Sequence, residues 1–303
     1  MNEELLDRCS LFYETRTAMD GAYRYTDCFT VSACAAHLAA SGSQITAKEL
    51  KELRRKYNGQ TGPLSMLRAI SPAGVAVMAV SEDADAMLTK VKAAYKELRK
   101  KFIASEYTAV AAVLLAVSRP EDEFESTVSA ARTQFEAFRS LHKLRTDSTN
   151  IPVCLMLAMR AADPSVAANE AEACFNEMRK AHHFRCRWSM AEMLTLDPRG
   201  AAEKCAELFE LKTRLKTERK AFSMYYELAA LAFSPDELKE KADDALAIFD
   251  TLSGDRKFNG WRLDNGERLM TAYLVAAPSI ELLCLALTLH IEKRAAQAAA
   301  ASA

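Results

Sequence analysis

An apolar segment followed by an amphipathic, charged segment recurs seven times along this chain of 303 residues. Each apolar segment carries a large apolar residue followed by a small or apolar one. These pairs are Leu38-Ala39, Met78-Ala79, Leu115-Ala116, Leu157-Ala158, Leu194-Thr195, Leu231-Ala232 and Leu274-Val275, at steps of 40, 37, 42, 37, 37 and 43 residues. A period near forty residues is typical of stacked helical hairpins, because a single hairpin cannot bury its apolar face alone.

The two kinds of segment predict two layers of helices. Segments such as 108–115 and 153–158 are apolar on nearly every side, as in a helix that neighbours cover all round. A short apolar run also fits a buried strand, but Ala, Leu and Met dominate here, which favours a helix. The segments 87–102, 124–138 and 238–252 each have one apolar stripe at steps of three and four residues, so we expect them outside.

We therefore expect an all-α fold in which about seven helical hairpins form an α-α superhelix. The inner segments lack a polar stripe, so an open or tightly filled superhelix is preferred. A closed α/α toroid is the alternative. No linker interrupts the repeat, which predicts one helical-repeat domain over residues 1–294 and an Ala-rich C-terminal tail over 295–303.

Prolines mark the turns from apolar to amphipathic segments. Asp163 precedes Pro164, which predicts an N-cap before a proline in the first helical turn. Ser118 and Glu121 flank Pro120 with the spacing of a capping box. These signals place amphipathic helices directly after the turns.

Charge and cysteine usage narrow the class of protein. The formal net charge is −1, so we expect no membrane and no nucleic-acid partner. The eight cysteines include no C-x-x-C pair, which predicts reduced thiols in a cytoplasmic protein and no metal site. Because no glycine-rich nucleotide-binding motif is present either, no cofactor is predicted.

The connections that lead from an amphipathic segment to the next apolar one are rich in cations. Examples are Arg54-Arg55-Lys56 and Arg99-Lys100-Lys101, whereas the opposite turns are acidic, as at Glu121-Asp122-Glu123. In a hairpin array the two kinds of connection lie on opposite rims. Complementation of helix macrodipoles explains this pattern structurally. The functional explanation is an anion site, since the inner helices begin on the basic rim and present free amides there.

Polar, basic and aromatic residues of this rim are the ligand-binding candidates. They are Arg68, Arg99, Lys100, His142, Arg187, Trp188, Tyr226 and Arg268. Together they predict a helical-repeat binding or scaffold module for a small anionic ligand or a protein partner.

Three carboxylates near the starts of apolar segments suggest a different function. If the array closes, Glu106, Asp147 and Glu227 converge and two of them can act as an acid/base pair. The alternative function is therefore an α/α-toroid enzyme with catalytic carboxylates at the mouths of the inner helices. Helix capping and ion pairs between repeats explain the same residues without a reaction, so the residues do not decide whether the protein is an enzyme.

Several stretches resemble an uncharacterised bacterial family, the domain of unknown function numbered four thousand and three. They are Tyr95-Lys96-Glu97-Leu98-Arg99, Ser105-Glu106-Tyr107, Tyr226-Glu227-Leu228-Ala229, Phe258-Asn259-Gly260 and Arg268-Leu269-Met270. The similarity is collinear over roughly residues 1–277. It implies a helical protein and supplies no activity, substrate or catalytic residue.

Overall fold

The computed structural model describes residues 3–42, 44–180, 188–219, 238–254, 258 and 262–302. Within these residues every regular element is an α-helix or a short 3-10 helix, and no strand occurs. The predicted all-α class is confirmed.

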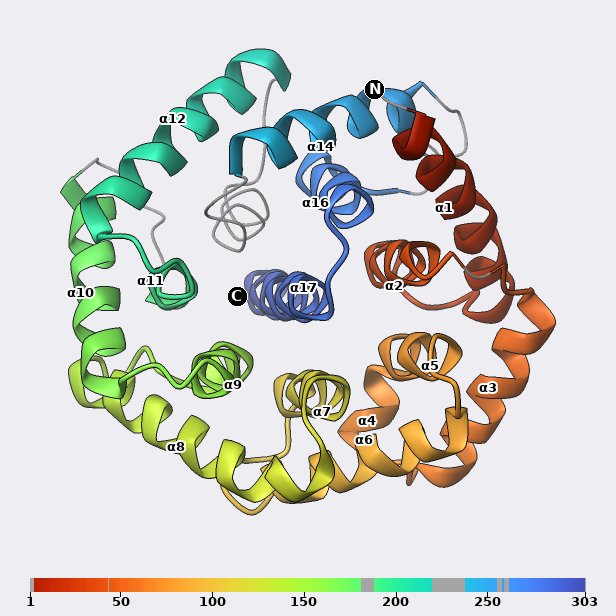
Figure 1. The fold of residues 1–303 in the computed structure, drawn as a ribbon, viewed down its shortest axis with the longest axis horizontal. Helices are drawn as coiled ribbons and strands as arrows, with labels where there is room; N and C mark the ends of the chain where they lie inside the picture. Colours follow the sequence, from red (N-terminus) through yellow and green to blue (C-terminus); the bar gives the residue numbers. More distant parts are fainter. Residues whose placement is uncertain are drawn as a thin grey trace.

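The described helices form two concentric layers (Figure 1). The outer layer consists of α1 (Glu3–Ala22), α3 (Ala47–Gln60), α6 (Ala84–Leu98), α8 (Phe124–Leu141), α10 (Pro164–Lys180), α12 (Ala201–Arg219) and α14 (Leu238–Ser253). The inner layer consists of α2 (Cys28–Ala40), α5 (Ser71–Ala79), α7 (Glu106–Ser118), α9 (Ile151–Met159), α11 (Trp188–Leu194) and α16 (Asn265–Ala276). The short helices α4 (Met66–Ala69), η1 (Glu121–Glu123) and η2 (Ser148–Asn150) lie in connections.

The repeat read from the sequence corresponds to this layering. Every apolar pair within the described residues lies in the last two turns of an inner helix or at its end, and Leu231-Ala232 lies outside them. Inner helices are buried on nearly all sides, as in α7, where Thr108 to Ala116 are all buried. Outer helices bury one stripe, as in α6, where the buried residues are Leu88, Val91, Ala94 and Leu98.

The array curves until its two ends meet. The first outer helix, α1, packs against α14, and the first inner helix, α2, packs against α16. The first and last described hairpins thus lie side by side, and the described helices curve around a common centre, as in the toroid that the sequence left as the alternative; this curvature is also compatible with the predicted α-α superhelix.

The last helix, α17 (Ile280–Ala301), lies in the centre of the ring (Figure 1). It packs against α2, α7, α9 and α16, and residues 282–290 are all buried. The inner helices have apolar faces toward the centre of the ring. An apolar helix at this position covers these faces, so that they pack against side chains instead of water. Residues 295–301, the Ala-rich segment, continue α17 as helix.

Helix starts follow the proline signals in one case and depart from them in another. Asp163 accepts a hydrogen bond from the backbone N–H of Val166 at 2.9 Å and caps α10, as predicted. The predicted capping box at Pro120 is wrong. Ser118 still belongs to α7, and Pro120 itself is the N-cap of the 3-10 helix η1.

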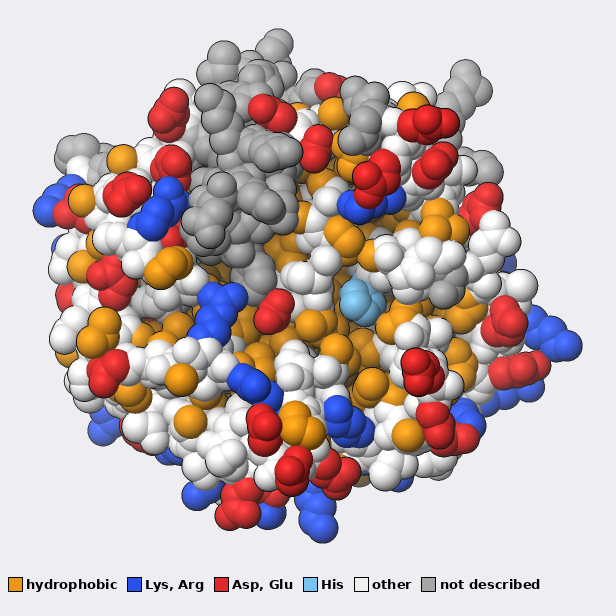
Figure 2. Space-filling model, in the orientation of Figure 1, with side chains coloured by type: hydrophobic (Ala, Val, Ile, Leu, Met, Phe, Trp, Pro, Cys, Tyr) orange, Lys and Arg blue, Asp and Glu red, His pale blue; other side chains and the backbone are white. Residues whose placement is uncertain are grey.

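Outer and inner helices alternate along the chain, so all connections from an outer to the next inner helix lie on one face of the ring. We call this the inner-start face, and its described connections are 23–27, 61–65, 99–105 and 142–147. Figure 2 shows one face of the molecule, with hydrophobic side chains across its middle and charged side chains mostly toward its periphery.

Candidate functional site

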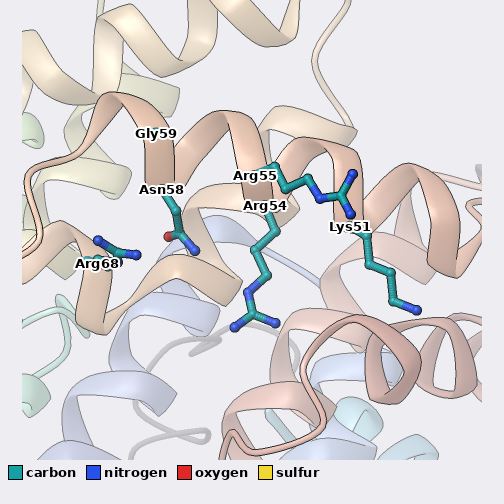
Figure 3. A pocket seen from close by; sticks show the side chains of 6 residues that line it. All are labelled: Lys51, Arg54, Arg55, Asn58, Gly59 and Arg68. Carbon is teal, nitrogen blue, oxygen red and sulfur yellow. The ribbon is translucent and has the colours of Figure 1, made fainter.

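A hollow of about 470 Å³, open to solvent, lies along α3 and α4. Figure 3 shows the side chains that line it from these two neighbouring helices. They are Lys51, Arg54, Arg55, Asn58, Gly59 and Arg68. Among the described residues no carboxylate lines this hollow, which we call the basic pocket.

Packing of Tyr57 sets the position of α4 against α3. Its side chain is fully buried, and its phenol donates a hydrogen bond to the Leu67 carbonyl at 3.0 Å. The ring lies so close to Gly74 of α5 that a Cβ on this glycine would be 2.2 Å from Cε2 of the tyrosine. Since Arg68 follows Leu67 directly, the buried tyrosine brings Arg68 to the pocket.

The cations of the basic pocket differ in how they are held. Arg54 donates from Nη1 to the Ala22 carbonyl at 2.5 Å, and its guanidinium carbon lies 4.8 Å from the ring centroid of Tyr23. Lys51, Arg55 and Arg68 are exposed, and no hydrogen bond or ion pair joins them to another described residue. One cation therefore ties α3 to the end of α1, and three face the hollow.

Asn58 adds a neutral polar group to the same wall. Its Oδ1 atom is out of contact with water and has no hydrogen-bond partner among the described residues. The carbonyl oxygen of this side-chain amide is therefore a hydrogen-bond acceptor that no described residue satisfies.

Two predicted rim residues lie on the inner-start face outside the pocket. Arg99 is the C-cap of α6 and donates to the Phe102 carbonyl at 3.2 Å. Lys100 forms an exposed ion pair with Glu97 at 2.6 Å. The structure places both residues in the connection 99–105, away from the lining of the basic pocket.

His142 and Trp188 belong to an aromatic cluster. Their ring centroids are 4.2 Å apart, and His142 Nε2 lies 2.5 Å from Glu172 Oε2. Trp188 is buried and donates from its indole N–H to Thr146 Oγ1 at 3.2 Å. These contacts pack α8, α10 and α11 together, and they account for both residues structurally.

Of the three remaining ligand candidates, the structure describes only Arg268. Arg187 and Tyr226 lie outside the described residues. Arg268 is in the first turns of α16, with its guanidinium carbon 5.9 Å from the ring centroid of Phe258.

Two of the three predicted catalytic carboxylates lie in the described part of the chain, and no hydrogen bond joins them. Glu106 is the first residue of α7, and Asp147 caps η2 by accepting from the Thr149 N–H at 2.8 Å. Glu227 lies outside the described residues. α7 packs directly against η2 and α9, and α17 lies on the central side of both helices (Figure 1).

A buried acid that the sequence analysis missed lies near Asp147. Glu192 of α11 is fully buried, and the side-chain amide of Asn150 donates to it. Burial raises the pKa of Glu192 well above its ordinary value, and the charges of Asp147 and Glu292 act in the same direction. No substrate reaches a fully buried carboxyl group in this conformation, so Glu192 is a structural acid here.

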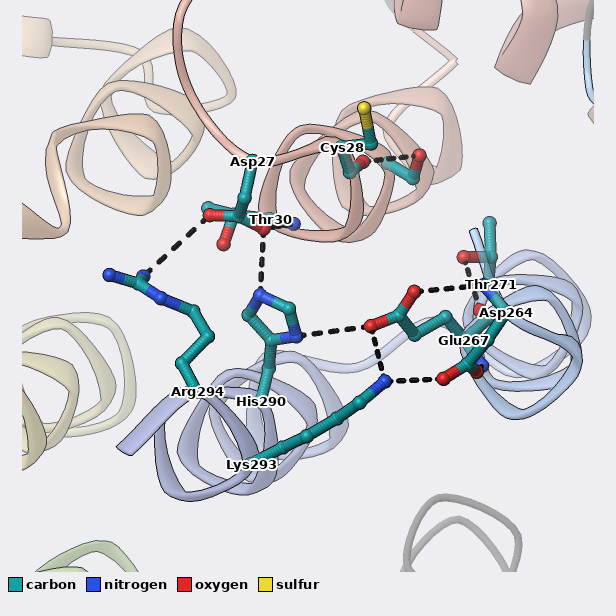
Figure 4. A network of polar contacts seen from close by, with 10 residues as sticks. Asp27, Cys28, Thr30, Asp264, Glu267, Thr271, His290, Lys293 and Arg294 are labelled. Carbon is teal, nitrogen blue, oxygen red and sulfur yellow. Dashed lines mark hydrogen bonds and ion pairs between the residues drawn. The ribbon is translucent and has the colours of Figure 1, made fainter. Parts of the chain in front are cut away.

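A second missed cluster joins the two ends of the ring to its centre (Figure 4). His290 of α17 lies between two carboxylates, with Nε2 2.8 Å from Asp27 Oδ1 and Nδ1 3.5 Å from Glu267 Oε1. Asp27 is the N-cap of α2, and Glu267 completes the capping box of α16. Lys293 approaches Glu267 at 2.8 Å. We call Asp27, Glu267, His290 and Lys293 the closure cluster.

The charges of the closure cluster support one another. Burial alone would lower the pKa of His290, but its hydrogen bonds to Asp27 and Glu267 raise it. Burial alone would raise the pKa of both carboxyl groups. Their contacts with His290, with Lys293 in the case of Glu267, and with backbone N–H groups lower each pKa to about 2. Because both ring nitrogens face carboxylates, these contacts favour the protonated form of His290 over the neutral ring.

The described residues contain neither a metal-binding cluster nor a membrane-spanning helix. No group of three or more His, Cys, Asp or Glu residues there is arranged to hold a metal ion. None of the described helices combines the length and the apolar character that crossing a membrane requires.

The fold and the basic pocket define the class: a closed ring of helical hairpins with a helix at its centre and a cationic hollow at one rim. The chain belongs to the family described as protein of unknown function (DUF4003), which matches residues 16–291. The resemblance seen in the sequence is thereby confirmed. Comparison with the curated proteins and with the solved structures found no match.

Proposed function

We propose that this protein is a binding module whose basic pocket takes a small ligand carrying a phosphate or a similar anionic group. The observation that carries the proposal is the lining of the pocket: Lys51, Arg54, Arg55 and Arg68 with no acidic residue among the described ones. A volume of about 470 Å³ suits a ligand of metabolite size. Guanidinium groups bind phosphate oxygens with paired N–H donors, which favours this class of ligand.

Helix-dipole complementation does not account for the whole pocket. Cations are stabilised by the macrodipole only within the last turn of a helix. Lys51 is the fifth residue of α3, and Arg68 comes from the four-residue helix α4. Arg54 does serve a helix end, that of α1, through the Ala22 carbonyl. Lys51, Arg55 and Arg68 leave a cationic surface that a bound anion would neutralise.

The enzyme alternative has weaker support. Asp147 is used as the cap of η2, and Glu192 is fully buried. A protein partner also suits a basic surface, but a concave hollow of this size favours a small ligand over a flat protein interface.

The test is thermal unfolding in low salt with inorganic phosphate, pyrophosphate and nucleotides. A ligand at a hundred times its Kd stabilises the fold by about 2.7 kcal/mol, and added salt weakens the effect. The double variant Arg55→Glu, Arg68→Glu should lose the stabilisation. The matched double variant Arg99→Glu, Lys100→Glu, elsewhere on the same face, should keep it. If no anion raises the Tm of the unaltered protein, or if the pocket variant is stabilised equally, the proposal is wrong.

A further inference from the structure

Four large apolar side chains on the inner-start face are mostly exposed to water. Tyr25 is 96% exposed, Leu64 93%, Ile103 70% and Leu144 99%. Each belongs to a different described connection of this face, in four successive repeats. We call these four residues the apolar tips.

The opposite connections carry no comparable residue in the described part of the chain. Among connections from an inner to an outer helix, the one exposed large apolar residue is Val80, at 37%. Exposing a single apolar side chain is ordinary. At the opposite ends of the helices, Val166 in the first turn of α10 is 66% exposed and Val117 near the end of α7 is 37% exposed, but neither recurs in equivalent connections as the apolar tips do.

Exposed cations accompany the apolar tips. Arg24 precedes Tyr25, Lys101 stands two residues before Ile103, and Lys143 and Arg145 flank Leu144. Leu64 stands four residues before Arg68 of the basic pocket. An exposed apolar side chain next to a cationic one suits the boundary between lipid headgroups and acyl chains. The apolar side chain can enter the acyl region while the cation contacts a lipid phosphate.

The opposite connections are acidic, with Glu82, Asp83, Glu121, Asp122 and Asp163 at the starts of outer helices. An anionic surface therefore attracts one face of the ring and repels the other. The formal net charge of −1 conceals this asymmetry. The expectation of no membrane partner rested on the net charge, and a contact made by one face does not depend on it.

We infer that the inner-start face docks on an anionic lipid bilayer, with the apolar tips inserted among the headgroups and the adjacent cations against lipid phosphates. The shape of the tips favours a bilayer over a protein partner. Tyr25, Leu64 and Leu144, exposed at 93 to 99%, stand out from the surface and form no groove for a peptide. A fluid bilayer closes around separate protrusions without a complementary shape, whereas a protein interface requires one. This inference goes beyond the proposed function, because the tips are distinct from the lining of the basic pocket.

The test is flotation of the full chain with vesicles of phosphatidylglycerol and phosphatidylcholine in equal parts, against vesicles of phosphatidylcholine alone. We expect flotation with the anionic vesicles only, weakened by salt. The variant Tyr25→Ser, Leu64→Ser, Ile103→Ser, Leu144→Ser should bind more than tenfold more weakly. Each of Lys101→Glu, Lys143→Glu and Arg145→Glu should weaken binding about fivefold or more, since one cation near such a surface contributes about 1 kcal/mol.

The control variant carries the same change on exposed apolar residues outside these connections: Leu6→Ser, Val80→Ser, Val166→Ser. It should float like the unaltered protein. A tryptophan in Leu144→Trp should shift its emission to shorter wavelength on anionic vesicles, whereas one in Val166→Trp should not. Failure of the unaltered protein to float with anionic vesicles in low salt would overturn the inference, as would equal flotation of the tip variant. The test of the basic pocket uses soluble anions and the flotation test uses vesicles. A failure of one proposal can therefore be distinguished from a failure of the other.

Discussion

A single close contact, between Tyr57 and Gly74, determines how the basic pocket is built. The tyrosine ring occupies the space in which any other residue at position 74 would place its Cβ. Its phenol reaches the Leu67 carbonyl only because α3 and α5 approach this closely. The backbone of Gly74 has no positive φ, so conformational freedom is not the reason for a glycine here. The reason is the close approach of the Tyr57 ring. Arg68 depends on this contact for its place beside Arg55.

We predict that Gly74→Ala destabilises the protein by about 1 to 3 kcal/mol, the usual cost of overpacking a tight core. The Cβ would lie 2.2 Å from Cε2 and 2.4 Å from Cζ of Tyr57, so the ring or α5 must move. Urea unfolding measures the effect. Gly59→Ala in α3 is the control, because no atom lies within 4 Å of its added Cβ. It should leave the stability unchanged or raise it by up to about 1 kcal/mol. Equal stability of the two variants would refute the tight contact.

At the scale of elements, the closure cluster ties α2, near the start of the chain, to α16 and α17, its last two described helices. Asp27 begins α2, Glu267 lies in the first turn of α16, and His290 comes from the middle of α17. Both carboxylates also cap their own helices, through Thr30 N–H for Asp27 and through the Asp264 N–H for Glu267. The two helices that meet where the ring closes, α2 and α16, are thus joined to its centre through His290.

The closure cluster predicts a specific dependence of stability on pH. The pKa of His290 is raised in the fold, so its contribution is complete below its ordinary value of 6.5 and is lost as the pH rises through the folded value. The pKa values of Asp27 and Glu267 fall from 3.8 and 4.5 to about 2, so their contribution is present above pH 4.5 and is lost as the pH falls toward 2. The stabilisation by the cluster should be greatest between pH 4.5 and 6.5.

The measurement is the difference in free energy of unfolding between the unaltered protein and His290→Gln, taken from urea unfolding at a series of pH values. Taking the difference removes the effect of other titrating groups such as His37, whose pKa burial lowers. We expect a positive difference between pH 4.5 and 6.5 that shrinks on both sides. A difference that does not change from pH 3 to pH 9 would mean that the ion pairs contribute nothing.

At the scale of the whole molecule, the ring and its central helix make one core. Residues of α17 such as Leu283, Leu285 and Ala286 are completely buried. The thiol of Cys284 lies 3.8 Å from the Val110 carbonyl of α7, although the two residues are 174 apart in the sequence. Removing α17 would expose the central faces of α2, α7, α9 and α16 together, so the last helix of the chain contributes to the stability of every part of the ring that it contacts.

The sequence predicts the layers of this fold well, because apolar periodicity is a local property. The period near forty residues locates inner and outer helices, and Asp163 before Pro164 locates the start of α10. It does not reveal that α17 fills the centre, since residues 280–290 read like one more apolar segment. A repeat describes contacts between neighbours in the chain, whereas the occupant of the ring's centre depends on closure.

The same limit applies to the candidate site. The cationic character of the rim and Arg68 were predictable from charge runs at helix ends. Lys51 and Asn58 were not, because they join Arg68 only through the packing of Tyr57 on Gly74. His290 gave no signal either, because its carboxylate partners lie 263 and 23 residues away along the chain. Asp264 and Glu267 did have the spacing of a capping box, which predicts the cap of α16 but not the ion pair.

Native-state hydrogen exchange of α17 tests the closed ring with a central helix most directly. The amides of Leu283 to Leu289 should exchange only by global unfolding, with the same opening free energy as Val110 to Leu115 of α7. The exposed end of α17, from Ala295 to Ala301, should exchange rapidly in the same experiment. In an open array the last helix would fray first. Exchange of Leu283 to Leu289 by local opening, several kcal/mol below that of α7, would contradict the account.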